Sequence, residues 1–381
     1  MSEKRILLAS LLKPVNDTRM YGKLGLSLCK LPNTEIHIAG FSAPIPAEVP
    51  ANLYFHPVFS FSRLSIKRFA AQHKYWLLLQ SIKPDLLIVC THELLLTSWL
   101  YCTKYKCKLI YDVQENYSLN LTAQDTYNPI LKRILAKGIQ SIETLTAPGI
   151  THFFLAEQSY AQELPFIGTN YTVLENKYKP AANYKPRQTP VQLKPGSIKL
   201  LYTGTISSIY GIFEAIAFAD HWHRINPQVT LTIIGYCAHE PTLQKLKQAI
   251  LNKPYITLIG GDRLVPHPDI LQAIATHDIG LLPYQPNEST YRCIPTKLYE
   301  YMAYGLPILM QYNKPWDDIL TAHKAGLSIN FNNYTFKQLE SDIYNSIFYN
   351  KSIPDSVFWD SEEINLLEQF TCILHGNENF K

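Results

Sequence analysis

Short apolar runs alternate with helical patterns along almost the whole chain. In the first half they cover 5–9, 35–39, 85–90, 108–112, 150–155 and 171–174, and in the second half 198–202, 229–234, 256–259, 279–282 and 307–310. The runs are continuously apolar, as in strands that helices cover on both faces. Because strand–helix–strand alternation favours parallel sheets with right-handed crossovers, the sequence predicts an α/β fold.

The length of 381 residues suits two domains. Segment 176–197 contains four prolines and no apolar periodicity, which indicates a linker. We therefore expect an N-terminal domain at 1–180 and a C-terminal domain at 181–355, each a doubly wound sheet with its ligand edge at the C-terminal ends of the strands. Apolar residues at helical spacing predict a final helix over 356–370.

The composition excludes several classes of protein. Hydrophobic residues make up 46% of the chain and charged residues 17%, so large cores are expected and disorder is not. No apolar run is long enough to span a bilayer, and the run that follows Met1 is too short for a signal sequence. The seven cysteines are odd in number and lack CxxC spacing, which predicts reduced thiols, a cytoplasmic protein and no zinc site.

Positive charge is concentrated in the first half. Residues 1–180 carry 19 Lys and Arg against 13 Asp and Glu, whereas residues 181–381 carry 16 against 18. Segment 63–83 holds five of these cations, no acid and several aromatic residues, so it can lie on an anionic membrane surface as a helix. An ordinary surface helix with one buried face is the simpler explanation. The overall basicity is too low to predict nucleic-acid binding.

The segment PTKLYEYMAYGLPIL, Pro295 to Leu309, carries the most informative motif. It predicts a helix that ends at Gly305 and leads into an apolar strand. Lys297 lies near the positive helix N-terminus, where phosphate is favoured, and Glu300 lies one turn later, where a carboxylate can accept hydrogen bonds from two ribose hydroxyls. An amphipathic helix with an exposed Lys–Glu pair is the alternative. The segment resembles the nucleotide-sugar-binding signature of GT-B glycosyltransferases, especially the large retaining family 4.

Two segments of the first half extend this resemblance. PVNDTRMYGK, Pro14 to Lys23, looks like the N-D-x-R-x-x-x-K segment of a bacterial branch of these enzymes. YDVQENY, Tyr111 to Tyr117, is similar to its Y-D-x-H-E-x-Y signature, with Gln114 where histidine is usual. Both follow predicted strands, so their polar side chains are expected to recognise the acceptor or to order the cleft; for Asp112, capping of a turn is a further explanation. The candidates are Asp17, Arg19, Lys23, Asp112 and Glu115.

The segment from Leu200 to Ile216 looks like the strand, glycine loop and helix that cradle the donor diphosphate in this family. It departs from the family at two positions, because Thr205 and Tyr210 replace the usual arginine and lysine. A cation about 4 Å from a phosphate gains roughly 4 kcal/mol at an effective dielectric near 20, whereas a helix terminus contributes about 0.3–1 kcal/mol. We therefore hypothesise that Arg292 and Lys297 supply the missing charge, Arg292 standing where the family has the first of two glutamates.

The remaining site predictions also follow from the resemblance. Glu300, Lys297 and Arg292 are the expected catalytic group. His267 and His277 are expected to be structural, and the loop at Pro283–Tyr284 to lie at the ligand edge. The expected donor-binding residues are Gly204, Thr205, Tyr210, Gly211, Gly235, Gly260, Gly261, Arg263, Pro295, Thr296 and Leu298.

The resemblance implies a GT-B fold, in which two Rossmann-like domains face a central cleft and a final helix, 356–381, rejoins the first domain. It implies transfer of a sugar, with retention, from a nucleoside-diphosphate sugar to a hydroxyl of a glycan or lipid-linked acceptor, as in bacterial polysaccharide biosynthesis. It implies no cofactor and no bound metal. A lipid-linked acceptor would suit a peripheral contact of 63–83 with the inner membrane face.

Two other functions remain open. A non-catalytic sugar-nucleotide-binding or scaffold subunit fits the replaced cations and the missing first glutamate. A GT-B sugar epimerase or phosphorylase is the weaker possibility, because no cofactor lysine or catalytic acid pair can be assigned.

Overall fold

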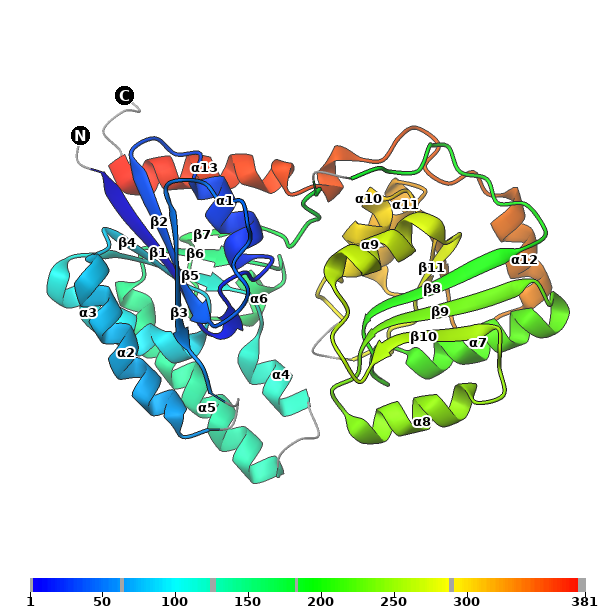
Figure 1. The fold of residues 1–381 in the computed structure, drawn as a ribbon, viewed down its shortest axis with the longest axis horizontal. Coiled ribbons are helices and arrows are strands. Elements are labelled where there is room, and N and C mark those ends of the chain that lie inside the picture. The colour runs from blue at the N-terminus through cyan, green and yellow to red at the C-terminus, as the bar shows by residue number, and fades with distance from the viewer. Residues whose placement is uncertain (1–2, 62–64, 124–127, 182–183, 288–290, 376–381) are drawn as a thin grey trace. The chain divides into compact units, whose positions relative to one another are not determined.

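The computed structural model describes residues 3–61, 65–123, 128–181, 184–287 and 291–375. Its internal contacts divide the chain into two compact units (Figure 1). Unit 1 comprises Met1–Lys179 and Trp359–Lys381, and unit 2 comprises Pro180–Phe358. The sequence places the corresponding boundaries after residues 180 and 355.

Unit 1 is built on a seven-stranded parallel sheet of order β3-β2-β1-β4-β5-β6-β7. All four residues of β4, at the centre of this order, are buried, which explains the continuous apolar run there. The strands are β1 (Lys4–Pro14), β2 (Thr34–Phe41), β3 (Leu53–Phe59), β4 (Leu86–Val89), β5 (Lys108–Val113), β6 (His152–Leu155) and β7 (Tyr171–Val173).

The helices of unit 1 include α13 (Asp360–His375), drawn in red, which contacts the blue helix of Leu26–Leu28 (Figure 1). Trp359 anchors its start by donating a hydrogen bond from Nε1 to Ser27 Oγ at 2.9 Å. Further along, the Phe370 ring lies 5.8 Å from the Phe154 ring of β6. The other helices are α1 (Leu26–Leu28), which continues a π-helical turn over Met20–Gly25, α2 (Lys67–Ile82), α3 (Leu95–Tyr105), α4 (Tyr117–Ala123), α5 (Pro129–Thr146) and α6 (Tyr160–Glu163).

Unit 2 has a six-stranded parallel sheet of order β10-β9-β8-β11-β12-β13. Its strands are β8 (Ile198–Thr205), β9 (Val229–Tyr236), β10 (Ile256–Gly261), β11 (Ile279–Leu282), β12 (Ile308–Gln311) and β13 (Gly326–Ile329). Its helices are α7 (Ile212–Ile225), α8 (Glu240–Ile250), α9 (His267–Thr276), α10 (Thr296–Ala303), α11 (Lys314–Ala322) and α12 (Phe336–Asn345). Both units therefore have the predicted doubly wound α/β architecture.

Each apolar run singled out in the sequence falls on a strand, but the sequence reading missed β3 and β13. Both are edge strands, which pair on one side only and need less apolar surface. Pro57 interrupts β3, as edge strands tolerate, and every residue of β13 is only half-buried. The final helix was expected from residue 356 and begins at Asp360, after a 3₁₀ turn over Asp355–Val357.

Most of the basic segment 63–83 forms α2, which ends before Lys83; Arg63 lies outside the described residues. One face of this helix is buried through Tyr75 and Leu79, while Phe69 is 82% exposed. No helix among the described residues has the length and apolarity required to cross a membrane. The same residues contain no group of three or more His, Cys, Asp or Glu side chains placed to hold a metal ion.

Candidate functional site

Three glycines line up at the C-terminal ends of neighbouring strands in unit 2. Gly204 of β8 pairs with Gly235 of β9, which in turn pairs with Gly260 of β10. A Cβ atom at Gly235 would lie 1.7 Å from the Gly204 carbonyl oxygen, so no larger residue fits there. The strands therefore pack too closely for side chains at this edge of the sheet, which we call the glycine edge.

A tight loop connects β8 to α7. Glycines stand at both ends of this loop: Gly204, near the end of β8, has a φ of 99°, and Gly211, just before α7, has a left-handed φ of 72°. A Cβ atom at Gly211 would lie 1.8 Å from the carbonyl oxygen of Pro283, which follows β11. Within the loop, the Tyr210 N–H donates to Ser207 Oγ at 3.2 Å. The start of α7 is thus held against the end of β11, and Tyr210 with it.

The predicted Lys–Glu pair lies at the start of α10 and reaches the same edge. Lys297 Nζ donates to Glu300 Oε2 at 2.8 Å, and His267 Nε2 lies 3.1 Å from Glu300 Oε1. The Lys297 side chain also runs past Gly204, where a Cβ atom would stand 2.8 Å from its Cε. The pair is therefore not the solvated surface pair that was the alternative.

Glu300 is ionised over the physiological pH range. Burial alone would raise its pKa, but the charge of Lys297 and the hydrogen bond and charge of His267 outweigh burial and lower the pKa to about 2. Each carboxylate oxygen already has one partner and retains a second lone pair. Glu300 can therefore accept further hydrogen bonds, as binding of a vicinal diol requires.

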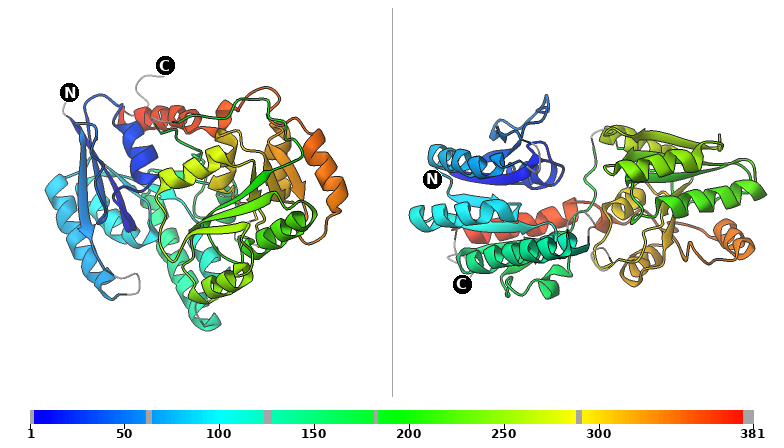
Figure 2. Two further views of the ribbon diagram at one scale, coloured as in Figure 1. Left: turned by 45° about the vertical axis from the view of Figure 1, so that its right-hand side comes forward. Right: turned by 90° about the horizontal axis from the view of Figure 1, so that it is seen from below.

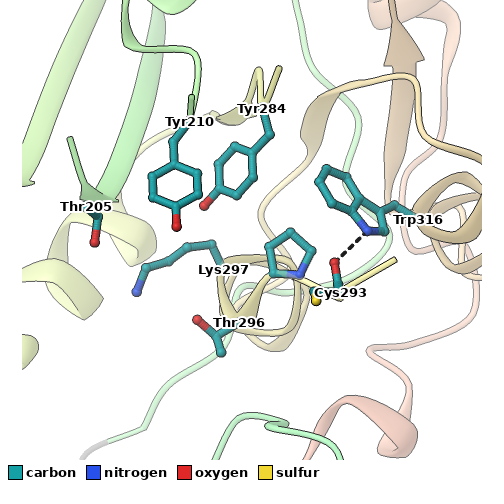
Figure 3. Close-up of a pocket in the computed structure, with 8 residues that line it drawn as sticks. Thr205, Tyr210, Tyr284, Cys293, Thr296, Lys297 and Trp316 are labelled. Atoms are coloured by element: carbon teal, nitrogen blue, oxygen red, sulfur yellow. Dashed lines mark hydrogen bonds between the residues drawn. The ribbon is translucent and has the colours of Figure 1, made fainter. Parts of the chain in front are cut away.

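Lys297 borders a pocket of about 230 Å³ (Figure 3). The rings of Tyr210 and Tyr284 lie 4.8 Å apart at 41°, with both hydroxyls directed toward the side where Lys297 lies. Trp316 Nε1 donates to the Cys293 carbonyl at 2.9 Å and so fixes the segment before α10. The pocket is lined by Thr205, Tyr210, Tyr284, Cys293, Pro295, Thr296, Lys297 and Trp316.

The pocket brings together the two positions that lack the family's cations and one of the two proposed substitutes. Thr205 and Tyr210 line the same pocket as Lys297. Among the described residues that line this pocket, Lys297 is the one with a positive charge. Arg292 is exposed and is not one of those residues. Lys297 thus lies beside the two positions that it is predicted to compensate; its role and that of Arg292 both stay predictions.

The other predicted donor residues lie at varying distances from the pocket. Pro295 and Thr296 line it, and Gly261 ends β10 beside the aligned glycines. Arg263 is exposed in the loop that follows. The prediction that Leu298 binds the donor is corrected by its burial: the side chain is fully buried in the core of unit 2 and offers a ligand no surface.

Three residues at the site were not among the predicted site residues. His267 was expected to be structural, but it contacts Glu300, and its place at the start of α9, after the Gly260–Gly261 loop, was the available signal. Cys293 and Trp316 carried no such signal. His277 is structural as expected, since its ring nitrogens contact the Ala273 carbonyl and Thr232 Oγ1.

In unit 1, Arg19 and Asp112 form a buried ion pair. Arg19 Nε lies 3.0 Å from Asp112 Oδ2, and its Nη2 lies 2.7 Å from Oδ1. Arg19 is 2% exposed and Asp112 is fully buried. Burial lowers the pKa of Arg19, but Asp112 outweighs it and raises the pKa. Gln114 Nε2 also donates to Asp112 at 2.6 Å. This arrangement suits ordering of the strand ends rather than direct contact with an acceptor.

The other unit 1 candidates divide between structure and surface. Asp17 Oδ1 accepts from the backbone N–H groups of Arg19 and Met20 at 3.0 and 2.9 Å, so it caps a turn. Lys23 is 7% exposed and donates to Asn176 Oδ1. Glu115 is exposed and accepts from Asn120 at 3.2 Å. Glu115 is therefore the candidate whose carboxylate is accessible to an acceptor.

Comparison with known proteins gives a family match for part of unit 2. Residues 198–338 match the family described as glycosyl transferases group 1, a range that contains β8, α10 and the whole pocket lining. No curated protein matches the chain in sequence.

Several solved structures share the fold of both units at low identity. Sucrose-phosphate synthase from Thermosynechococcus elongatus matches with a TM-score of 0.71 and 12% identity, over 98% of this chain and 100% of that one. Anabaena HepE in complex with UDP and glucose matches with a TM-score of 0.59 and 13% identity, over 98% and 100%. A putative UDP-N-acetylglucosamine 2-epimerase from Listeria monocytogenes matches with a TM-score of 0.62 and 10% identity, over 99% and 98%.

The solved structures establish the fold and leave the reaction open, because a transferase and an epimerase share it. The sequence match gives the family of residues 198–338, and that match includes the Lys297–Glu300 helix. The family match therefore covers residues 198–338 of unit 2, and the solved structures show that the chain as a whole has the GT-B fold.

Proposed function

We propose that the protein transfers a sugar from a nucleoside-diphosphate sugar to a hydroxyl of a glycan or lipid-linked acceptor, with retention of configuration. The observation that carries the proposal is the Lys297–Glu300 pair at the glycine edge of unit 2. An ionised carboxylate suits a ribose diol, and a cation beside the backbone of Gly204 suits a diphosphate. HepE was solved with UDP and glucose, so a uridine nucleotide is the first donor to test.

In this proposal Lys297 leaves Glu300 when the donor binds. Its Nζ would turn toward the diphosphate and stabilise the charge that develops on the leaving group, while the ribose hydroxyls replace it on Glu300. His267 would keep Glu300 oriented through Oε1. The hydroxyls of Tyr210 and Tyr284 would donate to phosphate or sugar oxygens in place of the family's cations. The pocket of about 230 Å³ holds part of such a donor, since whole ligand sites usually reach about 300–1,000 Å³.

The alternative is a subunit that binds a sugar nucleotide without turning it over. It is favoured by one observation: Thr205 and Tyr210 put neutral groups in the pocket where two cations are usual. Both proposals require donor binding, so they differ only in chemistry.

Binding is tested first by thermal shift against UDP, GDP, ADP, CMP, dTDP and their sugars. A ligand at 100 times its dissociation constant stabilises a protein by about 2.7 kcal/mol, which corresponds to a shift of roughly 5–10 °C for domains of this size. A selective shift that Lys297→Ala abolishes would support the site. The absence of a shift with every nucleotide would exclude both proposals.

Turnover then separates the two. Donor hydrolysis or transfer that is lost in Glu300→Ala supports the enzyme, whereas binding without turnover on any acceptor supports the scaffold. Asp318→Asn is the matched control, because Asp318 is an exposed carboxylate on α11 of the same unit, paired to Lys314.

A further inference from the structure

Helix α5 of unit 1 exposes an apolar stripe. Ile130, Leu131, Ile134 and Leu135 are 69%, 44%, 62% and 40% exposed, and Leu145, near the other end, is 59% exposed. Spacings of three and four residues place these side chains on one side of the helix. Figures 1 and 2 show the N-terminal end of α5 projecting beyond the sheet of unit 1.

The opposite side of α5 faces the protein, where Ile139 and Ile142 are half-buried. The buried side chains there are Ala136, Glu143 and Thr146. Glu143 accepts a hydrogen bond from the Tyr111 hydroxyl at 2.9 Å. The helix therefore packs on unit 1 through its inward side, while five larger apolar side chains remain exposed on its outward side. Burial within unit 1 does not account for this stripe, and a contiguous exposed apolar patch marks an interaction surface.

The charges beside the stripe are all positive. Arg133 and Lys137 are exposed and lie next to Ile130 and Ile134 around the helix. The helix contains one acid, Glu143, and it is buried. An outward face that combines Ile and Leu with Arg and Lys, and presents no acid, is complementary to an anionic lipid surface, where apolar groups enter the acyl boundary and cations contact head groups.

We propose that α5, through Ile130, Leu131, Ile134, Leu135, Arg133 and Lys137, docks unit 1 on an anionic membrane surface. A second copy of the chain is the less suitable occupant. Self-complementary dimer contacts bring the same patch together twice, which would place the Arg133 and Lys137 side chains of both copies close to one another. The proposal concerns a different element from α2 and does not depend on the reaction catalysed.

The test is co-sedimentation of the full chain with vesicles of phosphatidylcholine alone and of phosphatidylcholine with phosphatidylglycerol. The unmodified chain is expected to bind the anionic vesicles, and added salt should weaken this binding. Ile130→Ser with Ile134→Ser should lower the partition coefficient at least about tenfold, since two exposed anchors are lost. Arg133→Glu with Lys137→Glu should lower it by a similar factor on anionic vesicles only.

Leu251→Ser is the matched control, because Leu251 is 78% exposed at the end of α8 in unit 2 and belongs to neither α5 nor α2. It should leave binding unchanged, and all these surface variants should keep the melting temperature of the unmodified chain. The proposal is overturned if the chain ignores anionic vesicles, if the α5 variants bind as well as the control, or if light scattering shows a dimer that the α5 variants dissociate.

Discussion

Lys297 lies against the backbone of Gly204, so closely that a Cβ atom added at Gly204 would stand 2.8 Å from the lysine Cε. Lys297 belongs to α10 and Gly204 to β8. Among the described residues that line the pocket, Lys297 is the only predicted catalytic cation, and this contact places it at the glycine edge. Several measurable consequences follow from this and from other buried charges.

Gly204→Ala should displace Lys297 and weaken donor binding by about tenfold or more, since one cation–phosphate contact is lost. The φ of 99° also disfavours alanine and should cost roughly 1–2 kcal/mol of stability. Nucleotide titration and urea unfolding measure the two effects. Gly138→Ala is the control: a Cβ there meets nothing within 4 Å, and alanine in α5 should stabilise by up to about 1 kcal/mol. Unchanged nucleotide affinity in Gly204→Ala would contradict the Lys297 role.

Glu300 should make stability depend on pH in the acid range. Its pKa falls from an ordinary 4.5 to about 2 in the folded chain, so the unfolded chain binds the proton first. The stabilisation is therefore complete above about pH 5 and is lost as the pH falls toward 2. Unfolding free energies at pH 7, 5 and 4 should fall less steeply in Glu300→Gln than in the unmodified chain. Parallel curves for the two proteins would show that Lys297 and His267 do not hold the carboxylate.

Asp112→Asn should destabilise unit 1 by about 3–5 kcal/mol, because it leaves the charge of Arg19 buried without its partner. Replacing both partners with apolar residues, Arg19→Met with Asp112→Leu, should recover most of that loss. Urea unfolding measures both changes. Asp318→Asn removes an exposed pair with Lys314 and should change little. If the double variant were as unstable as Asp112→Asn, an unpaired charge would not be the cause.

Glu143 should make the stability depend on pH in the opposite direction to Glu300. Burial raises its pKa to about 7, although the hydrogen bond from Tyr111 lowers it. The folded chain then binds the proton more tightly, so stability should decline from about pH 4.5 to pH 7 and level off above that. Glu143→Gln keeps the hydrogen bond acceptor, removes this decline and should stabilise the chain by roughly 2–3 kcal/mol at pH 8. Denaturant unfolding at pH 5 and pH 8 measures it; an equal effect of the substitution at both values would contradict a titrating Glu143.

Local sequence signals predicted the sheets and the helix of Lys297 and Glu300, because apolar runs, a Pro–Thr helix start and a closing glycine act within a few residues. The edge strands β3 and β13 were not predicted, because strands that are only partly buried have a weaker apolar pattern in the sequence than fully buried ones. The contact of His267 with Glu300 spans 33 residues, and that of Arg19 with Asp112 spans 93. Such contacts depend on which strands are neighbours, and single-sequence periodicity does not encode strand order.

The register of β8, β9 and β10 couples the core of unit 2 to its ligand edge. One residue inserted within β9 would move Gly235 out of line with Gly204 and Gly260. It would also turn the buried side chains of that strand to the opposite face. A single insertion in β9 would thus impair both folding and ligand binding. Length variation among descendants of this chain should therefore accumulate in the loops after the three glycines, where a change alters the ligand edge and spares the fold.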